Sequence, residues 1–257
     1  MKNECDYMIQ LMLPPGVESA SAVGDKFLRS LSALSLIDPV FSNWLLWDAV
    51  EKTSVPLDQA CKAITAFVEK NVVRDEDDEP LPEDGFHLFA SNFEYGNSRT
   101  MGLSVTAGGG QYLNQATLKA GSYKTPPDAS IVTYPIFKRS LLALISIWPC
   151  PWARVLVTHP DGQWISQSIG GFNSVYQQQR LMTWMGYLSA ERAEGLDAPS
   201  DLLTEQTPDG GLLMIATEER VDPTNTDQMK RCGALAAIMD DRKRVPWLGP
   251  NAPSMWG

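Results

Sequence analysis

The sequence has few of the residues from which metal centres and disulfide frameworks are built. Its four cysteines stand far apart without a C-x-x-C pair, and its two histidines form no cluster with them. This spacing argues against a zinc site, and scattered cysteines are typical of a reducing compartment. We therefore expect a protein that folds without a metal or a disulfide.

The short motifs of phosphate binding and hydrolysis are also missing. The chain contains no GxxxxGK[ST], GxGxxG, GxSxG or HExxH pattern, and the glycines at 108–110 lack the lysine of a phosphate cradle. His87 lies in a strand-like segment, and His159 lies in a THPDG turn beside Asp161. Because no elbow supplies a serine nucleophile, we expect structural roles for both histidines, no catalytic residue and no cofactor.

Long apolar runs are absent as well. No stretch approaches the roughly 18 consecutive apolar residues of a membrane span, and the segment MKNECDYMIQLMLPPG lacks the pattern of a signal peptide. The formal charge of −10, from 31 acidic and 21 basic residues, opposes binding to nucleic acid or an anionic membrane. We expect a soluble cytoplasmic protein whose partner is basic.

Two similar segments indicate how the chain is organised. FLRSLSALSLIDP, from Phe27, and FKRSLLALISIWP, from Phe137, agree at 8 of 13 positions. Both have apolar residues at helical spacing and a proline stop, and strand-like segments precede and follow each. The sequence therefore predicts an α+β fold of two related strand-helix-strand halves with mainly antiparallel sheets. We assign residues 1–110 and 111–257 to these halves, related by internal duplication and packed as one compact unit.

The other elements follow from periodicity and turn residues. We expect a second helix in PLDQACKAITAFVEKNV, strands in FHLFASNF, RTMGLSVTAGG and LMTWMGYLS, and a helix or loop near Tyr176 to Arg180. LLTEQTPDGGLLMIAT predicts a hairpin, and NTDQMKRCGALAAIMDD predicts the last helix. The tail VPWLGPNAPSMWG is too rich in proline and glycine for regular structure, yet its tryptophans suggest docking.

Acidic and aromatic residues are the candidates for partner binding. The acidic run at residues 75–84 is either a solvated loop or a negative patch that binds a basic protein surface, as phosphate would. The spacing of its carboxylates does not fit a calcium-binding loop. Trp44 and Trp184 are expected in the core, whereas two tryptophans flank a proline bend and are expected to be exposed. The candidates are Asp75, Glu76, Asp77, Asp78, Glu79, Glu83, Asp84, Trp148 and Trp152.

The C-terminal part resembles a known family. WMGYLSAE, followed by TPDGGLLMIATEERVDPTNTDQMKRCGALAAIM, is similar to the end of the bacterial immunity protein 52 family, and the helix leading into FSNWLLWD resembles its opening. Such proteins are encoded beside polymorphic or type VI secretion toxins, often restriction-endonuclease-like DNases, and protect the producing cell by binding the toxin. The resemblance implies a cognate toxin with a basic nuclease domain as partner, without catalysis or cofactor.

The resemblance transfers no binding motif, and it leaves the mechanism open. Inhibition by occlusion of the toxin's DNA-binding cleft and inhibition by blocking toxin assembly both fit. Two other functions remain as alternatives. One is a small-molecule hydrolase with a pocket between the halves, using His159 and Asp161. The other is a chaperone or adaptor that loads an effector for secretion.

Overall fold

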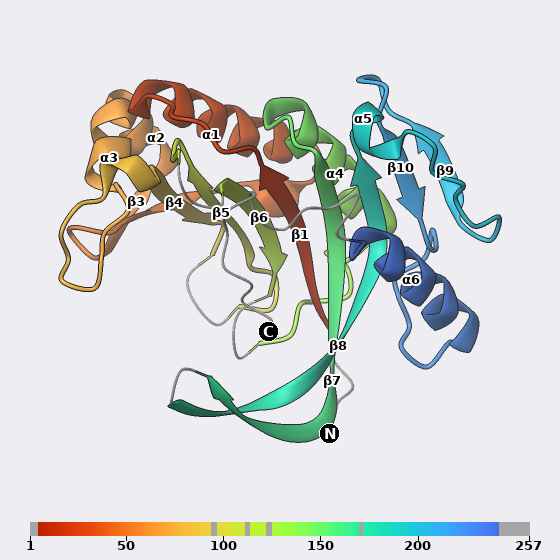
Figure 1. Ribbon diagram of the computed structural model, residues 1–257. Coiled ribbons are helices and arrows are strands. Elements are labelled where there is room, and N and C mark those ends of the chain that lie inside the picture. Colours follow the sequence, from red (N-terminus) through yellow and green to blue (C-terminus); the bar gives the residue numbers. More distant parts are fainter. Residues whose placement is uncertain (1–4, 94–96, 111–113, 122–124, 170–171, 242–257) are drawn as a thin grey trace.

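Ten strands in the described part of the chain form one sheet in which every neighbouring pair is antiparallel (Figure 1). The computed structural model describes residues 5–93, 97–110, 114–121, 125–169 and 172–241, without the side chains of residues 159–181. The strand order is β3-β2-β4-β5-β6-β1-β7-β8-β10-β9. The strands are β1 (Asp6–Leu13), β2 (Leu45–Asp48), β3 (Thr53–Pro56), β4 (Phe86–Ser91), β5 (Met101–Ala107), β6 (Asn114–Ala120), β7 (Trp152–Ile169), β8 (Phe172–Leu188), β9 (Leu203–Gln206) and β10 (Leu212–Ile215).

The sheet runs through both predicted halves. β1 lies between β6 and β7, where Ile9 pairs with Leu118 on one side and with Val155 on the other. A strand from the start of the chain is thus enclosed by strands that we assigned to the second half. The α+β class and the antiparallel sheet are confirmed, whereas the division at residue 110 and the duplication stay predictions.

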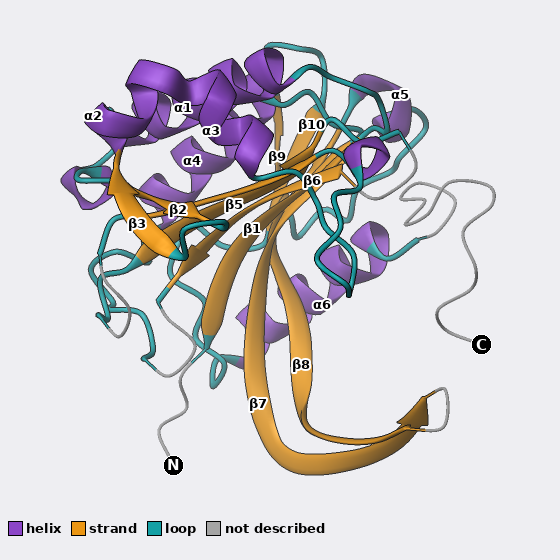
Figure 2. Ribbon diagram, turned by 90° about the vertical axis from the view of Figure 1, so that its left-hand side faces the viewer, coloured by secondary structure: helices purple, strands orange, loops and turns teal. Residues whose placement is uncertain are grey.

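Helices cover the two faces of the sheet unequally. The first four helices lie on one face, and α6 lies against β8 on the other face (Figures 1 and 2). Helix α6 comes close because β8 has Gly186 there, where an added Cβ would lie 2.8 Å from Met239 Sδ. The helices are α1 (Ala20–Ser35), α2 (Leu57–Ala60), α3 (Ile64–Lys70), α4 (Tyr134–Ile147), α5 (Ala190–Ala193) and α6 (Thr226–Met239), with short 3-10 turns η1 (Pro39–Phe41), η2 (Cys61–Ala63) and η3 (Pro82–Asp84).

Side-chain caps fix the starts of the three long helices. Ser19 accepts a hydrogen bond from the backbone N–H of Ala22, and Thr133 and Asn225 cap α4 and α6 in the same way. The single helix expected over residues 56–72 is instead broken into α2, η2 and α3. None of the helices in the described residues is long and apolar enough to cross a membrane.

The two similar segments form α1 and α4, which pack against each other on the same face of the sheet. Trp148, at the end of α4, is only 2% exposed, and its Nε1 donates a 2.8 Å hydrogen bond to Ser30 Oγ of α1. Trp152 is fully buried and opens β7 inside the sheet. The expected exposure of both tryptophans is therefore wrong, because the proline bend leads from a packed helix directly into a central strand.

The hairpin of β7 and β8 corrects two further predictions. THPDG is not a turn, and the residues near Tyr176 to Arg180 are neither helix nor loop, since both segments belong to strands that extend beyond the body of the sheet (Figures 1 and 2). Pro160 of β7 has no N–H to donate to β8. The strand tolerates this proline because a β-bulge, seen as a register shift between Pro160 and Trp164, interrupts the regular pairing there. The predicted tail at 245–257 lies outside the described residues, and so do the side chains of His159 and Asp161.

Candidate partner-binding surface

The acidic loop, residues 75–84, joins α3 to β4 and is held in shape by its own hydrogen bonds. Asp75 Oδ1 accepts 2.9 Å bonds from the backbone N–H groups of Asp77 and Glu79. Arg74 donates a 2.7 Å bond to the backbone carbonyl of Asp78, which has a left-handed backbone with φ of 64°. The loop is therefore a closed turn whose backbone is held in place by these bonds.

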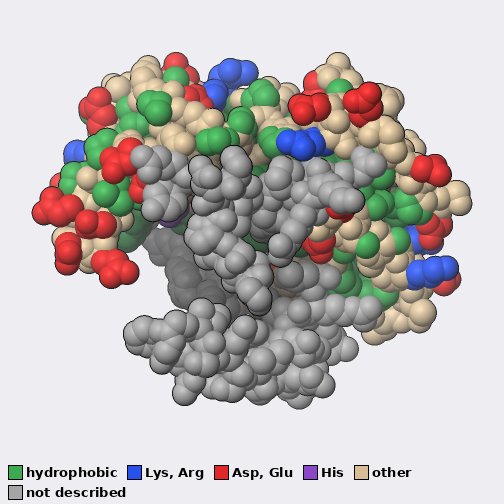
Figure 3. Space-filling view, in the orientation of Figure 1, with side chains coloured by type: hydrophobic (Ala, Val, Ile, Leu, Met, Phe, Trp, Pro, Cys, Tyr) green, Lys and Arg blue, Asp and Glu red, His purple; other side chains and the backbone are tan. Residues whose placement is uncertain are grey.

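Most carboxylates of this loop face solvent. Asp75 to Glu79 and Glu83 are exposed, and acidic side chains gather over this edge of the molecule (left in Figure 3). Asp84 is the exception, since it is 7% exposed and its backbone lies against Gly109. Burial, and then the charge of Glu83, raise the pKa of Asp84. Asp84 is thus part of the packed base of the loop, and its expected place on the surface is corrected.

The side of β2, β4, β5 and β6 opposite α1 forms a second surface, which we call the open sheet face. Alternation along the strands sends Leu88, Leu103 and Leu118 into the core under the helices. Their neighbours, such as Ser104 and Thr117, point the other way and line a cavity of about 860 Å³. In the described part of the chain, α6 covers β8 and no helix covers this region.

Three aromatic side chains stand on the open sheet face. Trp47, Phe89 and Phe93 line the cavity, and they are 40%, 39% and 38% exposed. The ring of Phe89 lies over Gly102, where an added Cβ would be 3.2 Å from Cε2. We did not single out these residues from the sequence. The signal in the sequence was FHLFASNF, a strand segment with apolar residues on both faces. A half-buried strand has them mainly on the face that points into the core.

The charged residues that line the cavity of the open sheet face are lysines. The described lining of its cavity includes Lys52 and Lys119 but neither aspartate nor glutamate. Lys119 Nζ lies 3.8 Å from Asp6 Oδ2, and both side chains are substantially exposed. The open sheet face therefore combines aromatic rings, hydroxyl groups and two ammonium groups in a chain that is acidic as a whole.

His87 lies on β4 with its Nε2 3.1 Å from Ser104 Oγ, at one end of the open sheet face. Partial burial lowers the pKa of His87, so that its ring is neutral at physiological pH. The contact with a serine hydroxyl in a regular strand pair agrees with the structural role expected for this histidine. Within the described residues, no group of three His, Cys, Asp or Glu side chains is placed to hold a metal ion.

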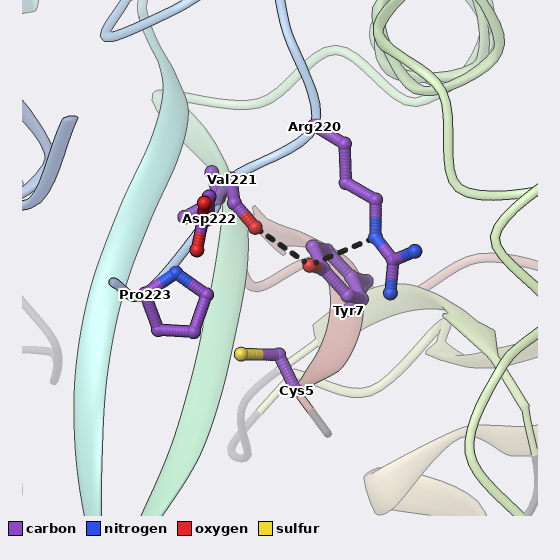
Figure 4. A pocket seen from close by; sticks show the side chains of 6 residues that line it. All are labelled: Cys5, Tyr7, Arg220, Val221, Asp222 and Pro223. Atoms are coloured by element: carbon purple, nitrogen blue, oxygen red, sulfur yellow. Dashed lines mark hydrogen bonds between the residues drawn. The ribbon is translucent and has the colours of Figure 1, made fainter. Parts of the chain in front are cut away.

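A smaller cavity of about 230 Å³ lies between the start of β1 and the segment before α6 (Figure 4). Tyr7 donates a 3.1 Å hydrogen bond to the carbonyl of Val221 and accepts one of 3.3 Å from Arg220 Nε. Burial raises the pKa of the Cys5 thiol to about 11, so that it is protonated at neutral pH and is not a reactive thiolate. These contacts tie β1 to the C-terminal part of the chain.

An exposed, preformed acidic loop and an open aromatic sheet face are features of a protein that binds another protein. Comparison with known families agrees with this class. The model of the family described as immunity protein 52 matches residues 15–242, so the chain belongs to the immunity protein 52 family. The resemblance seen in the sequence is thereby confirmed. Membership implies that the chain binds a cognate toxin and has a non-enzymatic role.

The fold is also found among solved structures. The T6SS protein PA0821 of Pseudomonas aeruginosa is similar with a TM-score of 0.51 and 10% sequence identity, over 91% of this chain and 72% of that chain. At this identity the likeness concerns the fold alone. No curated protein matches the sequence.

Proposed function

We propose that this chain is the immunity protein of a secreted nuclease toxin, which it binds and neutralises in the cytoplasm of the producing bacterium. The observation that carries the proposal is the family match over residues 15–242. The structural likeness to a T6SS protein supports delivery of the toxin by such a system. We propose a restriction-endonuclease-like DNase with a basic nuclease domain as the toxin.

The acidic loop is the physical argument for a nuclease. A surface that binds DNA carries Lys and Arg side chains for the phosphates, and six exposed carboxylates in this loop present the opposite charge. Because the loop is already closed by the bonds of Asp75 and Arg74, little entropy is lost when it meets a basic surface. We propose occlusion of the DNA-binding cleft as the mechanism that this charge supports, with blocking of toxin assembly as the alternative.

The direct test is co-expression of this chain with the product of the neighbouring toxin gene. We expect the two proteins to co-purify, and cells carrying the active toxin to survive only when this chain is present. A chaperone or adaptor would instead be needed for toxin export, which is measured by secretion of an inactive toxin from cells lacking this chain. Cells that die despite equal expression of this chain would refute the immunity function.

Charge reversal tests the acidic loop itself. The sharpest variant is Glu76→Lys, Asp77→Lys and Glu79→Lys together, because it leaves the side chain of Asp75, which closes the turn, unchanged. Exposed charge pairs contribute roughly 0.2–1 kcal/mol each, so we expect Kd to rise by about tenfold and to depend less on salt. Affinity and salt dependence that both stay as in the wild type would remove the loop from the interface.

A matched control lies at the other end of the sheet. Glu191, Asp197 and Asp201 are exposed in and after α5, and their replacement by lysine changes the formal net charge from −10 to −4, as the loop variant does. We expect this control to bind the toxin with an affinity close to that of the wild type. An equal loss of affinity in both variants would mean that binding depends on the net charge of the protein and not on the position of the acidic loop.

A further inference from the structure

The open sheet face is an apolar surface without a described partner in the chain. Single exposed apolar residues are normal on proteins, but three aromatic residues that line one cavity form a patch of the kind that marks an interaction site. Phe89 has a structural explanation, since its ring covers the space left by Gly102. For Trp47 and Phe93 the described residues show no such role, and both side chains are partly exposed.

The size of the open sheet face suits a protein partner. The strands β2, β4, β5 and β6 have 4, 6, 7 and 7 residues. At about 3.4 Å per residue and about 4.8 Å between strands they give a flat area of roughly 390 Å², before side-chain relief. A standard protein–protein interface buries about 800 Å² on each partner. The open sheet face therefore supplies about half of such an interface, and the neighbouring acidic loop adds to it. Figure 1 shows this loop at the edge of the sheet, on the side away from α1.

Charge complementarity decides the chemistry of the occupant. Lys52 and Lys119 line the cavity without a carboxylate in its described lining, although the chain carries a net charge of −10. Asp6, outside that lining, lies 3.8 Å from Lys119 Nζ in an exposed and therefore weak ion pair. A purely basic partner surface fits the acidic loop but is repelled by Lys52, and less strongly by Lys119, whose charge Asp6 partly offsets. The open sheet face instead fits a segment that offers apolar side chains to Trp47 and Phe93 and a carboxylate to the lysines.

We propose that the open sheet face holds a surface segment of the toxin that carries apolar side chains and at least one carboxylate. This inference rests on the proposed function, because it names the site and the chemistry by which the toxin is held. The acidic loop and the open sheet face then form two parts of one interface. The loop takes the basic surface of the toxin, and the open sheet face takes an apolar, acidic segment beside it.

Thr117→Glu is the first test, because Thr117 lies at the middle of β6 and lines the cavity. It pairs with Ser104 of β5 on one side and with Gln10 of β1 on the other. A glutamate there adds bulk and negative charge without removing a core side chain. We expect Kd for the catalytically inactivated product of the neighbouring toxin gene to rise at least about tenfold, as in a fully desolvated interface centre. Thr204→Glu on the exposed edge strand β9 is the matched control, with an expected change in Kd below about twofold.

The lysines are tested by a second pair of variants. Lys52→Glu with Lys119→Glu should weaken binding about tenfold or more, whereas Lys62→Glu with Lys230→Glu, at exposed sites elsewhere, should leave it unchanged. Toxin variants selected to restore binding to the first pair should replace Asp or Glu by Lys or Arg. Restoring changes confined to apolar or basic toxin residues would overturn the carboxylate assignment.

The outcomes separate the inference from the proposed function. If the wild type neither binds nor protects against the toxin, the function itself fails. If the wild type protects and both open-face variants bind as tightly as it does, only the site assignment fails. Thermal unfolding of every variant must match the wild type, and Thr117→Glu with Lys52→Glu provide independent readings if one of them unfolds. A dimer of this chain alone that Thr117→Glu dissociates would show that a second copy occupies the face, and would overturn the inference.

Discussion

The hydrogen bond between Trp148 and Ser30 gives the most specific prediction for stability. Ser30 Oγ is fully buried in α1, where it donates a 2.9 Å bond to the carbonyl of Lys26 and accepts the 2.8 Å bond from Trp148 Nε1. Ser30→Ala removes the acceptor and leaves the indole N–H buried without a partner. A buried donor that loses its acceptor costs about 1–3 kcal/mol. We expect the free energy of unfolding to fall by that amount.

The chain contains its own control for this substitution. Ser140 occupies the equivalent position of α4 and is also fully buried, but its hydroxyl has no hydrogen-bond partner among the described residues. Ser140→Ala therefore removes a buried polar group that gains nothing from the fold. We expect a change within about 0.5 kcal/mol of zero, or a small stabilisation.

Urea and thermal unfolding measure both variants. For a chain of this size, 1 kcal/mol shifts Tm by about 2–4 °C, so Ser30→Ala should lower Tm by roughly 2–12 °C and Ser140→Ala should barely move it. A double-mutant cycle with Trp148→Phe isolates the bond, since Ser30→Ala should cost less once the indole N–H is gone. Equal losses in the two alanine variants would refute the reasoning, because the unpaired indole N–H would then not be the cause; helix propensity itself favours alanine over serine.

Three further predictions concern turns and thiols. Asp209→Ala should cost about 1–3 kcal/mol in urea unfolding, because the buried Tyr187 hydroxyl donates a 2.6 Å bond to it. Burial alone would raise the pKa of Asp209, but its hydrogen bonds hold the pKa below the usual 3.8. The stabilisation by the Asp209 carboxylate is therefore present above pH 3.8 and is lost as the pH falls through the lowered pKa. Gly85→Ala should destabilise by about 2 kcal/mol or more, since φ is +80° and a Cβ would collide with the Ala107 carbonyl oxygen. In the native protein a thiol reagent should modify Cys61 first, because Cys61 is exposed and the other three cysteines are buried. Mass spectrometry measures the order of labelling, and rapid labelling of all four cysteines would contradict the fold.

Local patterns predicted those elements whose cause is local. The apolar run of β1, the periodicity and cap of α1, and the hairpin turned by residues 208–211 all carry their signals within a few residues. The second part of β8 was predicted from LMTWMGYLS, but its first part was missed. QQQR, at 177–180, has no apolar alternation, and its pairing with β7 is set by the partner strand. The sequence therefore indicated the class of the fold but not the length of its central hairpin.

The candidate site shows the same division. A run of acidic residues predicts exposure well, because ionised carboxylates are rarely buried, and only Asp84 departs from it. For tryptophan, the neighbouring residues do not predict exposure. Trp148 and Trp47 both follow apolar residues, yet Trp148 is buried and Trp47 is exposed because different parts of the fold pack over them. The face of the sheet that α6 leaves open depends on the arrangement of helices across the whole molecule. That arrangement has no short-range signature.

The acidic loop and the open sheet face should act at different steps of binding. Charges in the loop attract a basic surface over distances up to the Debye length, about 8–10 Å at physiological salt, so they act before contact. The aromatic residues of the open sheet face act only once water has left the interface, and so they govern how long the complex lasts. Stopped-flow or surface plasmon resonance should therefore show slower association for the triple variant at Glu76, Asp77 and Glu79, and faster dissociation for Thr117→Glu. High salt should slow association of the wild type toward the rate of the triple variant and leave the effect of Thr117→Glu largely in place. If the triple variant changed dissociation alone, the loop would be a contact formed only in the final complex, and steering by charge would have no part in recognition.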